Sequence, residues 1–361
     1  MSESVNPMKT PDTIYEVYSV PIYETGHPEY LRGDEIGSNK AKVQKNDILL
    51  CKINPRINRV WVVTDESDYP NIASSEWIVI RNPEYNPFFL AWYFKSPKFK
   101  QLMVSEVTGI GGSLTRAQPK AVAEYPVPIL PIEEQNEIAS TLDKAYKIIT
   151  LRKQQLSALD DLIKARFVEM FGDPVLNQKS FPVFRMDEVV EFQGGSQPDK
   201  KYFEYEPTPD NIRLIQIRDY KTDNYITYIP KSMAKRFCTA DDIMIGRYGP
   251  PIFQILQGIE GSFNVALMKA TPKMGNREFV RSFLKQDCLL RYLEGMSKRT
   301  AGQDGIQMDK LKAYPFPLPP SNLQKQFADF AIQIEKSKSV IQESLDETQL
   351  LFDSLMQKYF G

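Results

Sequence analysis

Histidine and cysteine are scarce in this chain of 361 residues, which contains one histidine and three cysteines. Zinc sites are built mainly from His and Cys ligands, and a Cys–His dyad needs both groups together. With His27 as the lone histidine, zinc sites and Cys/His catalysis are poor interpretations, and no metal site is expected. The odd number and wide spacing of Cys51, Cys238 and Cys288 favour reduced thiols and a cytoplasmic location.

Long apolar runs and an excess of one charge are also missing. No run approaches the roughly 20 residues that a membrane span needs, and the opening MSESVNPMKT has no signal-peptide core. Hydrophobic residues make up 42% and charged residues 25%, as in globular proteins, and the length exceeds one typical domain. Because the net charge is −1, any nucleic-acid surface must concentrate its basic side chains locally.

Motifs of catalytic sites are missing as well. Residues 109–112 (Gly-Ile-Gly-Gly) lack the Lys-Ser/Thr of a P-loop, and residues 192–195 (Phe-Gln-Gly-Gly) lack the spacing of a nucleotide-binding turn. We predict a loop at both places. Residues 82–85 and 86–89 begin with Asn-Pro but lack the second proline of the Asn/Asp-Pro-Pro-aromatic motif of amino-methyltransferases. They predict a turn that leads into a helix.

One acidic string imitates a nuclease site. Asp210, Asp219 and Lys221 are residue types with which Mg²⁺-dependent nucleases hold their metal and act on phosphate. The string is short and degenerate, so it arises often by chance. A self-contained nuclease stays an alternative hypothesis, and it predicts Mg²⁺-dependent cleavage by the purified chain.

An internal repeat is the strongest feature of the sequence. Residues 125–131 (YPVPILP) recur as residues 314–320 (YPFPLPP), 189 positions later. The same shift, without a gap, aligns Gln135 with Gln324, and the Phe-Gly pair that ends at Gly172 with the pair that ends at Gly361.

The repeat extends upstream of this segment. Residues 47–50 (DILL) match residues 242–245 (DIMI) at a slightly larger shift, as expected if loops differ in length. A collinear series of this kind is not a chance match. The chain is therefore predicted to be a duplicated unit, each copy a globular part, a Pro-rich hinge and a long helical segment.

The long segments have the apolar spacing of a coiled coil. From Ile138 and from Phe327 the pattern 4-3-4-3 continues over about five heptads without internal Pro or Gly. About 38 residues at 1.5 Å each give a helix of roughly 57 Å. The alternative is two separate amphipathic helices, each packed on its own domain. The predicted helix-helix packing residues are Ile138, Leu142, Ile149, Leu156, Leu159, Ile163, Phe327, Ile334, Ile341, Leu345, Phe352 and Leu355.

The globular parts are predicted to be rich in β-structure. Residues 59–63, 77–80 and 212–217 are short, β-branched or aromatic segments bounded by turn residues. Helices are expected later in each copy, over residues 87–104 and 276–295. An α+β domain follows for each half.

Candidate DNA-binding residues occur at corresponding places in both copies. Residues 52–59 bring three cations and two carboxamides together, and Arg, Asn and Lys are the residue types that contact base edges and phosphates. Taken singly, each of these residues is better explained as a solvated surface charge or polar group. Their clustering at corresponding places in both copies makes DNA contact an equally good interpretation. The candidates are Lys52, Asn54, Arg56, Asn58, Arg59, Arg116, Arg247, Tyr248, Lys298, Arg299 and Gln303.

A globular unit, a Tyr-Pro-x-Pro-x-x-Pro hinge, a Gln near the helix start, a long helix and a terminal Phe-Gly, all present twice, resemble the specificity (S) subunit of type I restriction-modification enzymes. The resemblance implies an α+β fold with two β-rich target recognition domains in tandem, separated by two long helices that form an antiparallel coiled coil, with an internal pseudo-twofold repeat. The implied segments are a first recognition domain at 1–125, a hinge and helix at 126–172, a second recognition domain at 173–314, and a hinge and helix at 315–361.

The resemblance also implies a function without catalysis in this chain. Each domain is expected to recognise one half of a bipartite site in double-stranded DNA. The helices are expected to bind two modification subunits, which methylate adenine with S-adenosylmethionine, and possible restriction subunits, which use ATP and Mg²⁺. No cofactor and no catalytic residue is expected in the chain itself. A coiled-coil scaffold protein without DNA specificity is the alternative hypothesis.

The first copy departs from the second in one respect. The second copy opens with residues 181–190, and at a shift of about 190 their counterpart would precede Met1. We therefore expect the first recognition domain to lack an opening segment.

Overall fold

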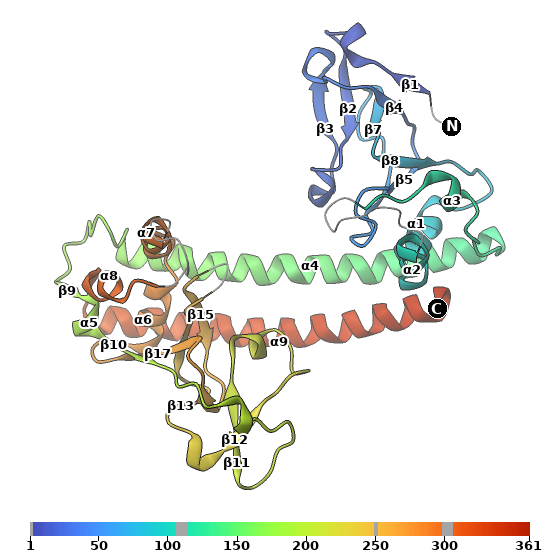
Figure 1. The fold of residues 1–361 in the computed structure, drawn as a ribbon. Coiled ribbons are helices and arrows are strands. Elements are labelled where there is room, and N and C mark those ends of the chain that lie inside the picture. The colour runs from blue at the N-terminus through green and yellow to red at the C-terminus, as the bar shows by residue number, and fades with distance from the viewer. Residues whose placement is uncertain (1–2, 106–114, 249–251, 298–305) are drawn as a thin grey trace. The chain divides into compact units, whose positions relative to one another are not determined.

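The computed structural model describes residues 3–105, 115–248, 252–297 and 306–361, which form two compact units (Figure 1). Unit 1 contains residues 1–153 and 343–361, and unit 2 contains residues 154–342. Both units include part of each long helix, whereas the prediction divided the chain into four consecutive segments; the predicted boundaries stay predictions. The predicted loop at 109–112 lies outside the described residues.

The described residues of unit 1 form two sheets. A five-stranded sheet has the order β1-β4-β7-β2-β3, and a three-stranded sheet has the order β6-β5-β8. In the first sheet β2 and β7 are parallel, whereas the other pairs of both sheets are antiparallel. The strands are β1 (Ser4–Val5), β2 (Ile14–Tyr18), β3 (Glu29–Arg32), β4 (Lys40–Lys42), β5 (Ile48–Cys51), β6 (Val60–Val62), β7 (Asn71–Ser74) and β8 (Trp77–Ile80).

Three short helices pack the three-stranded sheet of unit 1 against the long helices. They are α1 (Pro87–Lys95), α2 (Pro97–Ser105) and α3 (Pro119–Ala123). The side chain of Asn86 caps α1 by accepting hydrogen bonds from two backbone N–H groups of its first turn, so the predicted turn into a helix is confirmed. The core between these elements includes Phe89, Leu142, Met356 and Phe360, which are all buried.

Unit 2 contains a sheet of order β12-β11-β16-β13, a sheet of order β10-β17-β14-β15, and a two-stranded pair, β18 with β9. The strands are β9 (Val183–Arg185), β10 (Val190–Gly194), β11 (Asn211–Ile215), β12 (Tyr228–Pro230), β13 (Phe237–Cys238), β14 (Ile243–Gly246), β15 (Gln254–Gln257), β16 (Gly261–Phe263), β17 (Leu267–Pro272) and β18 (Pro315–Pro317). The short helices are α5 (Met186–Val189), α6 (Arg277–Leu284), α7 (Asp287–Ser297) and α8 (Met308–Ala313).

The two units repeat one topology. The order β4-β7-β2-β3 of unit 1 corresponds to β13-β16-β11-β12 of unit 2, and the central pair is parallel in both. The order β6-β5-β8 likewise corresponds to β15-β14-β17. The predicted α+β fold with an internal repeat is therefore confirmed.

The matching Asp residues begin corresponding strands. The Asp47 carboxylate accepts a hydrogen bond from the backbone N–H of Gln44 at 2.9 Å, and Asp242 accepts from Thr239 at 2.8 Å. Each aspartate thereby closes the turn before a buried strand, which explains why this residue recurs in the repeat. Since Asp47 corresponds to Asp242, Ile48 corresponds to Ile243.

The two long helices are α4 (Ile132–Phe171) and α9 (Ser321–Phe360), and within each unit a part of one lies beside a part of the other (Figure 1). In unit 1 the ring centroids of Tyr146 and Phe352 are 5.9 Å apart. In unit 2 those of Phe167 and Phe327 are 5.5 Å apart. Tyr146, in the first half of α4, contacts the last part of α9, and Phe167, near the end of α4, contacts the first part of α9. The two helices are therefore antiparallel. The coiled coil is confirmed.

All predicted helix-packing residues are buried or half-buried. The polar residues that interrupt the apolar spacing find partners on the opposite helix. Arg152 donates to the carbonyl of Ser344 and to the hydroxyl of Thr348, and Lys338 contacts the Asp160 carboxylate at 2.6 Å. Polar residues at such positions select one register of two helices, because a shifted register would leave them without partners.

A buried glutamine joins each long helix to its globular part. In unit 2 the side chain of Gln324 donates to the carbonyl of Pro319 at 2.6 Å and accepts from the backbone N–H of Asn276 at 2.7 Å. Asn276 is the cap of α6. In unit 1 Gln135 makes the same two contacts, with Leu130 and with Asn86. Each glutamine side chain thus connects the hinge, the helix start and a cap.

One local prediction was wrong. Residues 192–195 were expected to form a loop, but Val190–Gly194 form β10, which pairs with β17. An added Cβ on Gly195 would lie 1.9 Å from the carbonyl oxygen of Asn264. The glycine therefore serves a close backbone approach at the end of a strand rather than a loop.

Replacing the buried glutamine should destabilise unit 2. Gln324→Met keeps the volume of the side chain but leaves the Asn276 N–H and the Pro319 carbonyl without their partner. Since a buried polar group without a partner costs about 1–3 kcal/mol, we expect a loss of about 2–4 kcal/mol in the free energy of unfolding. Urea unfolding followed by circular dichroism measures it. Gln326→Met, at an exposed position of the same helix, is the matched control. Equal effects of the two substitutions would contradict the role of Gln324.

Candidate nucleic-acid interface

The loop between β5 and β6 carries five of the predicted DNA-binding residues. Asn54 and Asn58 adopt left-handed backbone conformations, with φ of 48° and 54°. Asn tolerates this region better than most residues, so these two positions shape the loop. Arg56, between them, is exposed at the tip.

Arg116 comes to this loop from a distant part of the sequence. The backbone N–H of Asn54 donates to Thr115, and that of Ala117 donates to Lys52. The segment that contains Arg116 therefore runs beside the start of the loop, and its guanidinium contacts the Glu76 carboxylate at 3.0 Å. The structure thus places Arg116 beside the start of the loop that carries Lys52 and Arg56, which the sequence alone could not show.

Two of the predicted residues have structural contacts. The side-chain amide of Asn58 donates to the carbonyl of Phe94 at 2.8 Å, which attaches the loop to α1. The side chain of Arg59 is only 20% exposed and lies 3.8 Å from Glu24. These contacts explain the two residues without DNA, so Arg56 is the stronger candidate for contact with a base.

The corresponding loop of unit 2 follows β14. The Arg247 guanidinium lies 5.3 Å from the ring centroid of Tyr248 and donates to the carbonyl of Val265 at 3.4 Å. Tyr248 is exposed. A cation held against an aromatic ring offers both hydrogen bonding and stacking to a nucleotide. Lys298, Arg299 and Gln303 lie outside the described residues.

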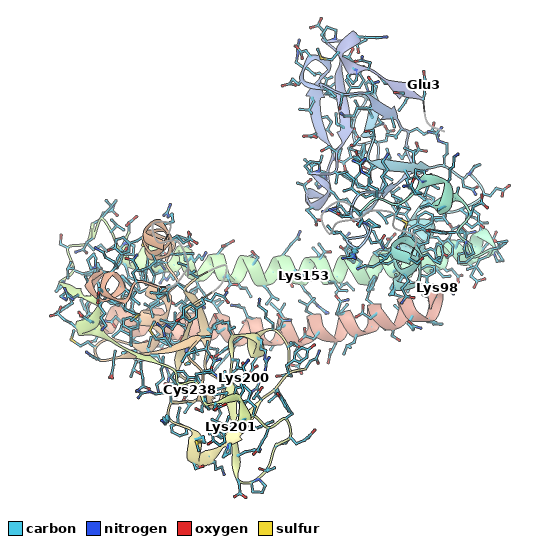
Figure 2. All side chains as sticks on the ribbon, in the orientation of Figure 1. Glu3, Lys98, Lys153, Lys200, Lys201 and Cys238 are labelled. Atoms are coloured by element: carbon cyan, nitrogen blue, oxygen red, sulfur yellow. The ribbon has the colours of Figure 1, made fainter. Side chains whose placement is uncertain are left out.

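Sequence analysis missed an aromatic surface in unit 2. Tyr205 and Tyr225 are 69% and 62% exposed, and the Arg218 guanidinium lies 5.9 Å from the Tyr225 ring. They line a groove of about 450 Å³ beside β12. Exposed Lys200 and Lys201 belong to the same unit (Figure 2). The repeated tyrosines among turn residues of this segment were the available signal.

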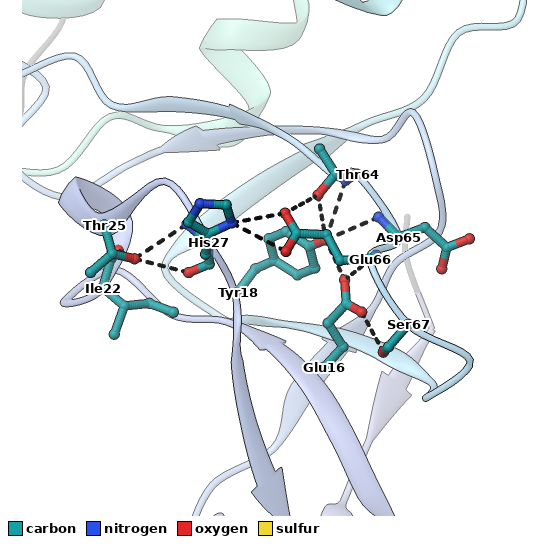
Figure 3. A network of polar contacts seen from close by, with 9 residues as sticks. All are labelled: Glu16, Tyr18, Ile22, Thr25, His27, Thr64, Asp65, Glu66 and Ser67. Atoms are coloured by element: carbon teal, nitrogen blue, oxygen red, sulfur yellow. Dashed lines mark hydrogen bonds and ion pairs between the residues drawn. The ribbon is translucent and has the colours of Figure 1, made fainter. Parts of the chain in front are cut away.

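A buried glutamate fixes the loop that follows β6 in unit 1 (Figure 3). Glu16 is fully buried and accepts hydrogen bonds from the Tyr18 hydroxyl at 2.6 Å, from the Glu66 backbone N–H at 3.0 Å and from the Ser67 hydroxyl at 2.6 Å. Burial, together with the hydrogen bond to Glu16, raises the pKa of Tyr18 to about 12. His27, exposed above this network, lies 3.2 Å from Glu66. The contact with Glu66 gives His27 a structural role, since it helps to hold the loop that follows β6.

The three residues of the nuclease hypothesis, Asp210, Asp219 and Lys221, do not form a common metal site. Asp210 and Lys221 are exposed, whereas Asp219 is buried. Asp219 accepts from the backbone N–H of Gln216, and burial raises the pKa of its carboxyl group. Its carboxylate closes a local turn. Among the described residues no group of three or more His, Cys, Asp or Glu could hold a metal ion.

In the same part of the chain no helix combines the length and apolarity of a membrane span.

Comparison with known proteins identifies the family. Residues 5–160 and 178–347 match the type I restriction modification DNA specificity domain. These two matches cover most of both copies, so the chain belongs to this family of specificity subunits. The family match favours neither the scaffold alternative nor the nuclease alternative.

Individual relatives agree with this assignment. The type I restriction enzyme MjaVIII specificity subunit of Methanocaldococcus jannaschii is 26% identical over 211 residues, which cover 52% of this chain and 46% of the relative. The chain thus matches about half the length of this curated relative.

Solved structures resemble the chain over its full length. The S subunit of a type I restriction-modification system from M. genitalium has a TM-score of 0.58 at 13% identity and is covered to 96%. The HsdS subunit from Thermoanaerobacter tengcongensis has a TM-score of 0.40 at 20% identity and is covered to 93%. Both comparisons cover 100% of this chain. The first supports the same fold.

Replacing the exposed arginines should weaken DNA binding. Arg56→Ala or Arg247→Ala is expected to cost about 1–3 kcal/mol of specific binding if the side chain contacts a base bidentately. A phosphate contact would instead weaken binding to every sequence and lower the salt slope by about one. Fluorescence anisotropy on specific and unrelated duplexes at several salt concentrations distinguishes the two.

Arg32→Ala is the matched control, because Arg32 lies at the end of β3 in the other sheet of unit 1 and is paired with Asp12 at 2.8 Å. It should leave binding unchanged. Unchanged binding for both Arg56→Ala and Arg247→Ala would remove the two loops from the interface.

Proposed function

We propose that this chain is the DNA-recognition subunit of a type I restriction-modification enzyme. Each β-rich domain recognises one half of a bipartite site in double-stranded DNA. The observation that carries the proposal is the duplication: both copies match the specificity domain, and both repeat one sheet topology with a charged loop after the matching strand. Two similar recognition domains in one chain suit a site of two short blocks.

Methylation mapping in the source genome tests the proposal. Deleting the gene should abolish adenine methylation at one bipartite sequence, and returning the gene should restore it. Returning the Arg56→Ala and Arg247→Ala double variant should restore it only in part. Methylation that is unchanged after deletion would contradict the proposed function.

The long helices have the length to separate the two halves of such a site. A helix of 40 residues spans about 60 Å, and one turn of DNA about 34 Å. In this proposal the domains determine the bases that are recognised, and the helices determine the spacer between them.

Shortening both helices should change the spacer alone. Deleting seven residues from each of α4 and α9 preserves the heptad register and removes about 10 Å of helix, the rise of about three base pairs. We expect methylation at the same half-sites with a different spacer. Deleting the seven residues from α4 alone is the control, since the two helices, now of 40 residues each, would then differ in length by one heptad. An unchanged spacer in the double deletion would contradict the role of the helices.

Catalysis is assigned to partner subunits. The long helices expose apolar side chains that their own pairing does not cover, and such side chains suit docking of partner helices. They include Ile148, Leu151, Leu162 and Val168 on α4, and Ile332, Val340, Leu350 and Leu351 on α9. Two modification subunits would dock there and supply S-adenosylmethionine chemistry. Restriction subunits with ATP and Mg²⁺ would join the same complex.

The purified chain should transfer no methyl group. A methyltransferase must hold an extruded adenine and S-adenosylmethionine in one pocket, and neither motif for this task occurs in the sequence. Incubation with labelled S-adenosylmethionine and DNA should give background incorporation, and adding the modification subunit should give transfer. Transfer by the chain alone, with contaminating methyltransferase excluded by mass spectrometry, would identify a catalytic subunit.

A further inference from the structure

Corresponding helices of the two units carry a lysine at the same place. The capping residues Asn86 and Asn276 align α1 with α6, and this alignment pairs Lys95 with Lys285. Lys95 is the last residue of α1, and Lys285 follows directly after α6. Desolvation lowers the pKa of both ammonium groups. The two units therefore keep a cation at one matching, partly enclosed position.

In unit 1 the indole of Trp92 fills the space beside this lysine. The side chain is buried, and its ring centroid lies 5.3 Å from that of Tyr146 and 5.4 Å from that of Phe352. The Lys95 ammonium group lies 4.8 Å from the centroid of the Trp92 ring. The indole N–H donates to the Asp143 carboxylate at 2.7 Å. The indole is thus held by aromatic rings of both long helices, by a cation and by a hydrogen bond.

The corresponding side chains of unit 2 are not aromatic. The alignment of α1 with α6 gives the first replacement, and the 189 positions between Gln135 and Gln324 give those on the long helices. The replacements are Ser282 in place of Trp92, Glu335 in place of Tyr146, and Ile163 in place of Phe352. Unit 2 thus lacks the three rings that fill this place in unit 1.

A cavity of about 400 Å³ occupies the matching place in unit 2. It is lined by Ser282, Glu335 and Ile163 together with Lys285, and it lies between α4, α9, α6 and β15 (Figure 1). Phe253, which is 4% exposed, contributes an aromatic ring to its wall. A cavity of about 150 Å³ is enough to hold benzene. The cavity of unit 2 therefore has room for an indole.

The polar groups of the cavity suit the same kind of group. Among the described residues, the Lys285 ammonium group has no hydrogen-bond or ion-pair partner. The carboxylates of Asp160, Glu278 and Glu335 also line the cavity, and a carboxylate accepts hydrogen bonds. A cation and an acceptor are the two polar contacts that the Trp92 indole makes in unit 1.

We propose that the cavity of unit 2 binds one aromatic group that carries an N–H or O–H donor, such as an indole or a phenol. The ring face attracts the Lys285 ammonium group, and the donor binds one of the carboxylates. Unit 1 supplies such a ring from its own sequence, whereas unit 2 receives it from another molecule. This molecule is a free aromatic compound or a partner polypeptide that inserts an aromatic side chain.

Two fluorinated probes test the proposal on the full chain by ¹⁹F NMR. We expect saturable binding of 5-fluoroindole at one site per chain, with a Kd of about 1 mM or lower. The second probe, N-acetyl-5-fluorotryptophan amide, resembles a side chain within a polypeptide. Its binding would assign the site to a partner's aromatic side chain, and binding of 5-fluoroindole alone would assign it to a free compound. Binding of neither probe would overturn the proposal.

A variant that fills the cavity locates the probe. Ser282→Trp places an indole where unit 1 has Trp92, so we expect probe binding to weaken at least tenfold while the melting temperature stays the same or rises. Ser337→Trp, at an exposed position of α9 in the same unit, is the matched control and should leave binding unchanged. Undiminished binding to the Ser282→Trp variant would place the probe elsewhere and refute the site.

A second variant tests the cation without filling the cavity. Lys285→Met keeps the length of the side chain at a position that solvent reaches, so the fold is preserved. Loss of the contact between ammonium group and ring should weaken probe binding about two- to fivefold. Lys325→Met, on an exposed lysine of α9 outside the cavity, is the control and should have no effect. Equal binding to the two lysine variants would show that Lys285 does not hold the ring and would overturn the proposed site.

Discussion

The connection between each domain and its long helix depends on one buried glutamine side chain. Gln135 and Gln324 each use the amide N–H to hold a hinge carbonyl and the amide oxygen to hold the N–H of a helix-capping asparagine. A proline-rich hinge has few N–H groups of its own, so its orientation needs a side chain that both donates and accepts. Glutamine meets that need at full burial, which explains its recurrence in both copies.

Much of the architecture could be predicted because the internal repeat and the heptad spacing each extend over many residues. Ile138, Leu142 and Phe327 follow the spacing of two helices, and the helix bounds differ from it by few residues. The candidate interface was harder to predict from the sequence, because the segment of Arg116 lies beside Lys52 only in the folded chain. Asn58 shows the converse, since a residue type typical of base contact holds the loop to α1 instead.

The strand β10 shows where local pattern fails. Its Gly-Gly end resembles a loop in sequence, but Gly195 is small because the backbone of Asn264 passes beside it. Only the partner strand reveals this requirement. Among the described residues, β10 has no counterpart beside β8 in the order β6-β5-β8 of unit 1.

Unit 1 is discontinuous in sequence, and this affects the order in which the chain folds during synthesis. Met356 and Phe360 belong to its core, yet they are made after the whole of unit 2. At about 5–20 residues per second, the ribosome needs roughly 10–40 s to reach them from the end of the first part of unit 1. The continuous unit 2 can close first, while the apolar face of α1 waits for its last partner. Nascent unit 1 therefore lacks part of its apolar core until the end of α9 has been made.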